Sequence, residues 1–123
     1  MVMTNREIVE DFLDLINRQG RVREAFERHV ADEYIQHNPA AGNGREDAIA
    51  LIEGLSGAPG FTPAVKRMVA EGDLVAVHMH VRFEAQPGLA VMDMFRLQDG
   101  KIVEHWDVIQ NVPAQSASGN SMF

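Results

Sequence analysis

The sequence of 123 residues contains no cysteine, which excludes disulfide bonds, thiolate metal ligands and a cysteine nucleophile. Basic residues are also few, because 11 Lys and Arg stand against 18 Asp and Glu, for a net charge of -7. Such a surface lacks the positive field that attracts nucleic acid or anionic membranes, so we expect neither as a partner. No apolar run reaches the roughly 20 residues that span a bilayer, and the N-terminus has no signal-peptide pattern, so we expect a cytoplasmic protein.

What the sequence does contain is enough apolar material, 46% of its residues, for one hydrophobic core. We therefore expect a single domain over residues 1–113. Small and polar residues follow Pro113. They predict a flexible C-terminal tail over 114–123, unless Met122 and Phe123 dock on the domain.

The first half of the chain has helical periodicity. Thr4 and Glu7 form a capping-box pattern, and apolar residues then recur at helical spacing up to Gly20. A second helix is predicted over 22–30, and a third around 48–55 that ends at Gly54 or Gly57. Between them, Tyr34 to Pro39 reads as a strand or a loop.

The second half has the two-residue period of strands. The connections between these strands are too short to cross over a sheet, so we expect an antiparallel meander. Helices followed by strands indicate an α+β fold with the helices on one face of a curved sheet. The predicted strands are Thr62–Ala70, Leu74–Ala85, Leu89–Gln98 and Lys101–Gln110.

Two registers are open for the hairpin around Asp99-Gly100. A two-residue loop would pair Asp93 with Trp106. A three-residue loop pairs Asp93 with His105 and Phe95 with Val103, sets Arg96 near Glu104, and gathers the apolar residues on one face. We favour the second register. It leaves three polar residues, Asp93, His105 and Asp107, on the face toward the core.

A carboxylate or imidazole on a core-facing position is costly unless it is paired. One explanation is a buried ion pair that only fixes the hairpin. The other is an apolar pocket in which burial beside an imidazole tunes Asp93 for proton abstraction.

Four segments resemble the SnoaL-like polyketide cyclases of the nuclear-transport-factor-2-like superfamily. They are Tyr34 to Pro39, Glu71 to Val75, Val91 to Arg96 and, the most specific, Asp99 to Asp107. The resemblance covers nearly the whole chain. It implies a conical barrel made of a curved antiparallel sheet packed against three N-terminal helices, with a central pocket, no metal, no organic cofactor and usually a dimer.

The same resemblance implies roles for single residues. Asp93 matches the aspartate that removes a carbon-bound proton in the cyclases, and His105 and Asp107 fall in the final-strand motif. Related epoxide hydrolases also place a pocket carboxylate on that strand. The inward positions Met79 and Val81 supply no arginine-aspartate pair of the hydrolase kind, so proton abstraction is favoured over epoxide hydrolysis.

The remaining candidate residues divide between the pocket and the outer face of the sheet. We expect Asp93 and His105 to be catalytic and the pocket to be lined by Tyr34, His37, Asn38, Met79, Val81, Phe83, Val91 and Asp107, with His37 favoured over its neighbours as the inward member of its segment. The opposite face would carry His78, His80, Met92, Met94 and Trp106. Such a surface is more typical of a homodimer interface than of a zinc site formed by His78 and His80.

The leading functional hypothesis is a cofactor-independent lyase, isomerase or cyclase that acts by general-base proton abstraction on a small, largely apolar carbonyl compound. His105, Tyr34 and His37 would hold or reprotonate the enolate. The alternatives are a non-catalytic small-molecule binding or dimerisation module, an epoxide hydrolase-like enzyme, and a metal-dependent enzyme that uses His78 and His80.

Overall fold

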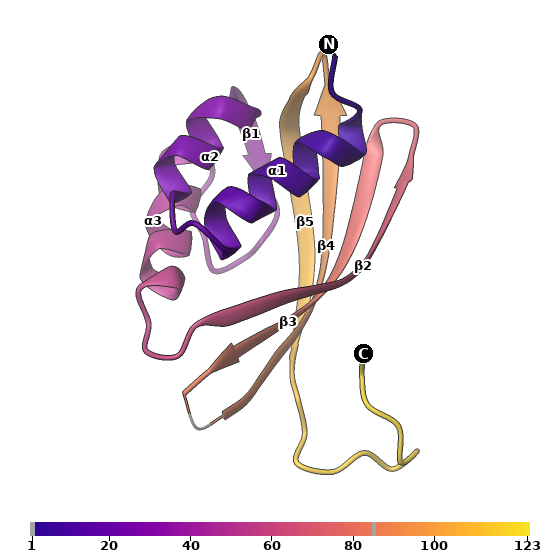
Figure 1. The fold of residues 1–123 in the computed structure, drawn as a ribbon. Helices are drawn as coiled ribbons and strands as arrows, with labels where there is room; N and C mark the ends of the chain where they lie inside the picture. The colour runs from indigo at the N-terminus through magenta and orange to yellow at the C-terminus, as the bar shows by residue number, and fades with distance from the viewer. Residues whose placement is uncertain (1, 85) are drawn as a thin grey trace.

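A computed structural model describes residues 2–84 and 86–123, and in it three helices pack on one side of a five-stranded sheet (Figure 1). This confirms the α+β class with three N-terminal helices. Of the predicted strands, only the end of one, at Ala85, lies outside the described residues. The elements are α1 (Asn5–Asn17), α2 (Val22–His29), β1 (Val30–Gln36), α3 (Arg45–Ser56), β2 (Thr62–Glu71), β3 (Leu74–Phe83), β4 (Gln86–Gln98) and β5 (Lys101–Asn111).

Helix α1 begins at the predicted capping box. The Thr4 hydroxyl accepts a hydrogen bond from the Glu7 N–H at 3.1 Å, and the Glu7 carboxylate accepts one from the Thr4 N–H at 2.8 Å. The apolar stripe of the helix is buried against the sheet and α2. Helix α3 ends at Ser56 with Gly57 as its C-cap, and Gly57 is one of the two glycines predicted to end it.

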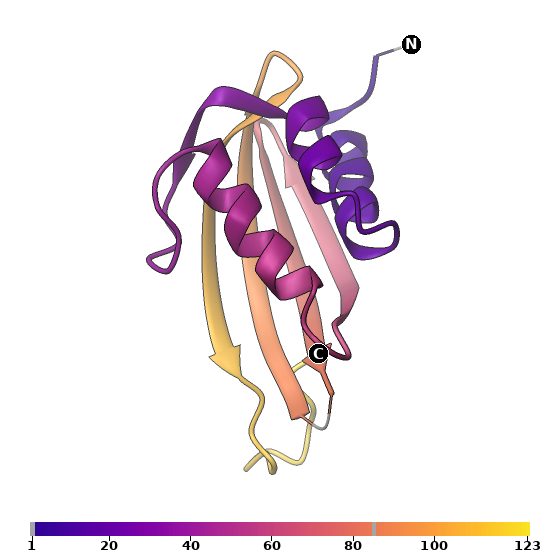
Figure 2. The same ribbon diagram turned by 90° about the vertical axis from the view of Figure 1, so that its left-hand side faces the viewer.

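The sheet has the strand order β1-β5-β4-β3-β2 and curves around the helices without closing on itself (Figure 2). Strands β2 to β5 form the predicted antiparallel meander. The expectation of a wholly antiparallel sheet is wrong at one edge, because β1 pairs with β5 in parallel, with Gln36 beside His105. This is sterically possible because α3 and the meander separate the two strands along the chain.

The inner face of the sheet supplies half of the core. Val75 and Val77 on β3 are fully buried and Met79 nearly so, which confirms that the odd-numbered residues of this strand face the helices. Phe95 on β4 packs edge-on against Phe12 of α1, with ring centroids 5.8 Å apart. Each such buried side chain contributes about 1.5–3 kcal/mol to the free energy of unfolding.

The β4–β5 hairpin corrects the predicted register. Its loop holds two residues, Asp99 and Gly100, both with positive φ, so that Gln98 pairs with Lys101. A bulge that follows on β5 shifts the pairing by one residue. Asp93 therefore lies opposite Asp107 instead of His105, and Phe95 lies opposite His105 instead of Val103. The predicted proximity of Arg96 and Glu104 is confirmed, since the two pair directly.

After β5 the chain turns back along the outer face of the sheet, away from the helices (Figure 1). The Phe123 ring stacks on His80 with centroids 4.1 Å apart and lies 5.4 Å from the ring of His78. Phe123 thus takes the docked position that the sequence left open, while the flexibility of 114–123 stays a prediction. None of the described helices is long and apolar enough to cross a membrane.

Candidate functional site

A cavity of about 140 Å³ lies between the inner face of the sheet and the three helices. Its volume is roughly ten times what one water molecule needs, which leaves room for a small organic molecule. Most of the lining is apolar and comes from all three helices and from β2 to β5. The residues are Phe12, Leu13, Ile16, Asn17, Phe26, Tyr34, Gln36, Asn38, Ala48, Leu51, Ile52, Leu55, Phe61, Pro63, Met79, Val81, Phe83, Leu89, Val91, Asp93, Phe95, His105, Asp107 and Ile109.

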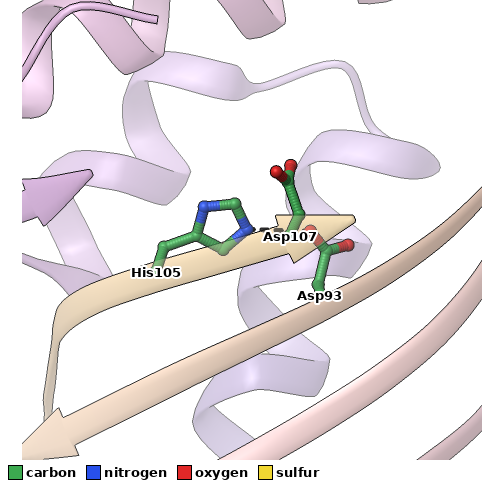
Figure 3. A group of neighbouring side chains, drawn as sticks. All are labelled: Asp93, His105 and Asp107. Carbon is green, nitrogen blue, oxygen red and sulfur yellow. Dashed lines mark hydrogen bonds and ion pairs between the residues drawn. The ribbon is translucent and has the colours of Figure 1, made fainter. Parts of the chain in front are cut away.

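Asp93, His105 and Asp107 project from β4 and β5 into this space as one group (Figure 3). The His105 Nε2 atom lies 2.8 Å from the Asp93 Oδ1 atom. Asp93 and Asp107 are cross-strand neighbours, and the bulge places His105 diagonally opposite Asp93. The predicted contact between Asp93 and His105 is therefore present, although the register that we expected to produce it is not.

A second layer of polar side chains comes from β1 and the residues after it. The Asn38 Nδ2 atom donates to both carboxylate oxygens of Asp107, at 2.9 and 2.8 Å. The Gln36 Oε1 atom lies 2.8 Å from His105 Nδ1, and Gln36 Nε2 donates to the Tyr34 hydroxyl at 2.9 Å. Within the described residues, every buried side-chain polar atom has a partner.

Burial dominates the electrostatics of the group. It raises the pKa of Asp93 above its ordinary value, against the opposing effect of the His105 hydrogen bond, and the nearby Asp107 adds to the rise. Burial also raises the pKa of Tyr34, with smaller contributions from Asp93 and Asp107, so its hydroxyl stays protonated. The site thus holds a carboxyl group whose proton affinity is raised beside an imidazole, in apolar surroundings.

In the described part of the chain, the same three residues lie close enough together to hold a metal ion. One potential ligand atom from each of Asp93, His105 and Asp107 lies within 4.8 Å of the other two. His78 and His80 are not in such a group. Their ring nitrogens contact Arg67 and the Pro87 carbonyl oxygen, respectively, on the other face of the sheet.

Comparison with known families decides the relationship. Residues 9–105 match the SnoaL-like domain. The protein belongs to the SnoaL-like domain family. This confirms the resemblance to the SnoaL-like family stated above. The matched range includes the first three motifs and the first seven residues of the last one, Asp99 to Asp107.

Solved structures show the same fold. An NTF2-like protein from Cytophaga hutchinsonii superposes with a TM-score of 0.74 at 18% identity, over 89% of this chain and 93% of the other. A proposed ketosteroid isomerase from Kribbella flavida gives 0.74 at 21% identity, over 91% and 82% of the two chains. IdmH, a proposed polyketide cyclase from Streptomyces antibioticus, gives 0.70 at 22% identity, over 87% and 92%. No curated protein sequence matched the chain.

In this SnoaL-like domain, most of the predicted pocket residues lie where we expected them. Tyr34, Asn38, Met79, Val81, Phe83, Val91 and Asp107 all line the cavity together with Asp93 and His105. No arginine is among the described lining residues, in keeping with the absence of the hydrolase-type pair on β3.

The prediction for His37 is wrong. Its ring lies outside the cavity, stacked on Trp106 with centroids 5.0 Å apart, and its Nε2 atom is 2.7 Å from Glu104 Oε2. The strand alternation of β1 extends beyond its end, so that Tyr34, Gln36 and Asn38 point inward and His37 points outward. The same alternation identifies Gln36 as a site residue, which the sequence reading missed because it treated the segment as irregular.

Proposed function

We propose that this protein is a cofactor-independent lyase, isomerase or cyclase that removes a carbon-bound proton from a small, largely apolar carbonyl compound. The observation that carries the proposal is the 2.8 Å contact between Asp93 and His105 inside an apolar cavity. A carboxylate in such surroundings is a stronger base than one in water, because burial raises its proton affinity. The names of the solved relatives, an isomerase and a cyclase, point in the same direction.

The proposed reaction needs only side chains of this chain. Asp93, in its ionised form, takes a proton from the carbon next to the substrate carbonyl, and the electron pair of the C–H bond moves onto the carbonyl oxygen. The Tyr34 hydroxyl accepts from Gln36, which leaves its own hydrogen free to bind this oxygen. The Asp93–His105 pair then returns the proton to another carbon, or to the alkoxide that an intramolecular aldol closure produces.

Replacing Asp93 by Asn tests this proposal directly. The assay is the exchange of carbon-bound hydrogen in a panel of small cyclic and aromatic ketones in D2O, followed by proton NMR. We expect the wild-type protein to accelerate exchange in at least one ketone, and Asp93→Asn to reduce that rate by about 10²- to 10⁴-fold, as the loss of a general base does. Glu104→Gln, which alters a carboxylate on the outer face, should leave the rate unchanged.

The alternative is a binding module without chemistry, in which the fully paired polar group only orients a ligand. It predicts ligand-induced NMR shifts with no ketone exchanged above the protein-free rate, and equal behaviour of the wild type and Asp93→Asn. Either result would contradict the catalytic proposal. An epoxide hydrolase-like reaction has less support, because Met79 and Val81 occupy the inward positions of β3.

We further propose that the protein acts in the cytoplasm as a homodimer formed through the outer sheet face, with Met92, Met94, Trp106, His78 and His80 in the interface. Met92 and Met94 are 49% and 40% exposed there, and the neighbouring Val108 is 74% exposed. Phe123 already covers the two histidines, so the contact would centre on the methionines and Trp106.

Sedimentation equilibrium tests the dimer. Trp106→Glu should weaken association by more than about tenfold, because the loss of a central aromatic anchor is costly at an interface. The exposed hairpin variant Gln98→Glu serves as a control for added charge. A monomeric wild type at micromolar concentration would exclude the proposed interface.

A further inference from the structure

The Gln36 side chain makes three hydrogen bonds at the rim of the Asp93–His105 pair. Its Oε1 atom accepts from the Asn38 backbone N–H at 3.0 Å and lies 2.8 Å from His105 Nδ1, while its Nε2 atom donates to Tyr34 at 2.9 Å. The backbone donor at Asn38 fixes which end of the amide is oxygen. The orientation of the Gln36 side chain is therefore determined by its own neighbours and not by His105.

An amide oxygen can accept but never donate a hydrogen bond. His105 must therefore carry its hydrogen on Nδ1 when it contacts Gln36. The other ring nitrogen, Nε2, then faces Asp93 Oδ1 at 2.8 Å with a lone pair. One further proton has to lie between Nε2 and the carboxyl group, either on Asp93 or on the imidazole, for this contact to be a hydrogen bond.

This arrangement has a consequence for the loss of that shared proton. A neutral histidine that was free to change tautomer would move its hydrogen to Nε2 and donate it to the ionised Asp93, which would stabilise the deprotonated pair. Gln36 opposes this change of tautomer. If Nδ1 lost its hydrogen, its lone pair would be repelled by the lone pairs of the Gln36 amide oxygen. The deprotonated pair is thereby kept in the form with the highest proton affinity.

We propose that Gln36 is a positioning residue that sets the tautomer of His105 and so raises the basicity of the Asp93–His105 pair. The catalytic consequence rests on the proposed function above, whereas the tautomer itself does not. The other titratable groups that face the pair are Tyr34 from β1 and Asp107 from β5. Asp107 is held by Asn38, and the lining residues of α1, α2 and α3 are uncharged.

The tautomer can be measured without any substrate. In protein labelled with ¹⁵N-histidine, long-range ¹H–¹⁵N correlation spectra distinguish a protonated from a bare ring nitrogen, and the absence of one signal in His105→Leu assigns His105. We expect Nδ1 of His105 to stay protonated across the titration of the wild type. In Gln36→Leu we expect the neutral ring to carry its hydrogen on Nε2, and the pair to lose its shared proton at a lower pH.

Two variants separate this role from a general effect on folding. Gln36→Glu keeps an oxygen acceptor for His105 Nδ1 and for the Asn38 N–H, so, unlike Gln36→Leu, it should retain the hydrogen on Nδ1 of His105. Gln98→Leu, the same loss of an amide at an exposed position of the hairpin, should behave as the wild type. A wild-type His105 that is bare at Nδ1, or a Gln36→Leu spectrum and titration equal to those of the wild type, would overturn the inference.

The ketone exchange assay adds the catalytic readout. Gln36→Leu should lower the exchange rate by at least about tenfold and move the acidic limb of its pH profile in the same direction as the titration, since a histidine in the wrong tautomer is a poor partner. If the spectra agree with the prediction while the wild type exchanges no ketone, the tautomer assignment stands and the proposed function fails. If exchange occurs and Gln36→Leu leaves its pH profile unchanged, the positioning role fails instead.

Discussion

Two histidine–carboxylate pairs lie on opposite faces of β5, and their geometries are nearly the same. His105 and Asp93 are 2.8 Å apart on the inner face, and His37 and Glu104 are 2.7 Å apart on the outer face. In the inner pair the two side chains are 11% and 12% exposed. In the outer pair they are 41% and 16% exposed.

The two carboxyl groups nevertheless shift in opposite directions. The pKa of Glu104 lies below its ordinary value, because His37 and Arg96 both donate to it and outweigh the opposing effect of partial burial. The pKa of Asp93 lies above its ordinary value, because burial outweighs the effect of the hydrogen bond between Asp93 and His105. An imidazole beside a carboxyl group thus makes a surface ion pair in one place and a candidate base in the other, because Asp93 is buried near Asp107 whereas Glu104 is supported by Arg96 as a second donor.

Removing the histidine from each pair should expose this difference most clearly. His105→Leu leaves Asp93 buried without its partner, and we expect the free energy of unfolding to fall by about 3 kcal/mol or more at pH 7. His37→Leu leaves Glu104 in contact with Arg96 and with water, so the free energy of unfolding should fall much less in this variant. Urea unfolding followed by circular dichroism measures both.

Lowering the pH provides the control for this prediction. Below the ordinary pKa of an aspartate, 3.8, Asp93 is protonated in the folded and the unfolded states alike, so the cost of His105→Leu should shrink there. Equal losses for the two variants at pH 7, or a loss for His105→Leu that does not depend on pH, would contradict the contrast between the two faces.

The sequence predicted that Asp93 and His105 lie on the inner face, because side chains alternate along a strand and the apolar residues mark the inner side, whereas the inward position expected for His37 was wrong. It could not predict the register. The Asp99-Gly100 turn holds two residues, and the extra residue that restores the alternation is a bulge on β5, which no turn pattern announces. The register we favoured and the observed one differ by two residues, so both place Asp93 and His105 on the same face.

Contacts between segments far apart in the sequence were the other feature that could not be predicted. The parallel pairing of β1 with β5 joins residues about 70 positions apart, and nothing local in Tyr34 to Pro39 encodes it. Without that pairing the segment of Tyr34 to Pro39 is interpreted as irregular, and we expected His37 to be its inward member. Once β1 is known to be a strand, its alternation alone assigns Gln36 and Asn38 to the cavity and His37 to the outer face.

The pH dependence of stability gives the smallest and most specific test of the comparison. A carboxyl group with a raised pKa in the folded state favours the protonated form, so Asp93 lowers stability as the pH rises above the unfolded-state value near 3.8. Glu104, whose folded-state pKa is lowered from 4.5, acts in the opposite sense, and its contribution is lost as the pH falls through the folded-state value. Between about pH 3 and pH 7, stability should therefore rise more steeply with pH in Asp93→Asn than in the wild type. In Glu104→Gln it should rise less steeply. Because the two substitutions are the same in kind, slopes that change in the same direction would mean that the two faces do not differ as the structure indicates.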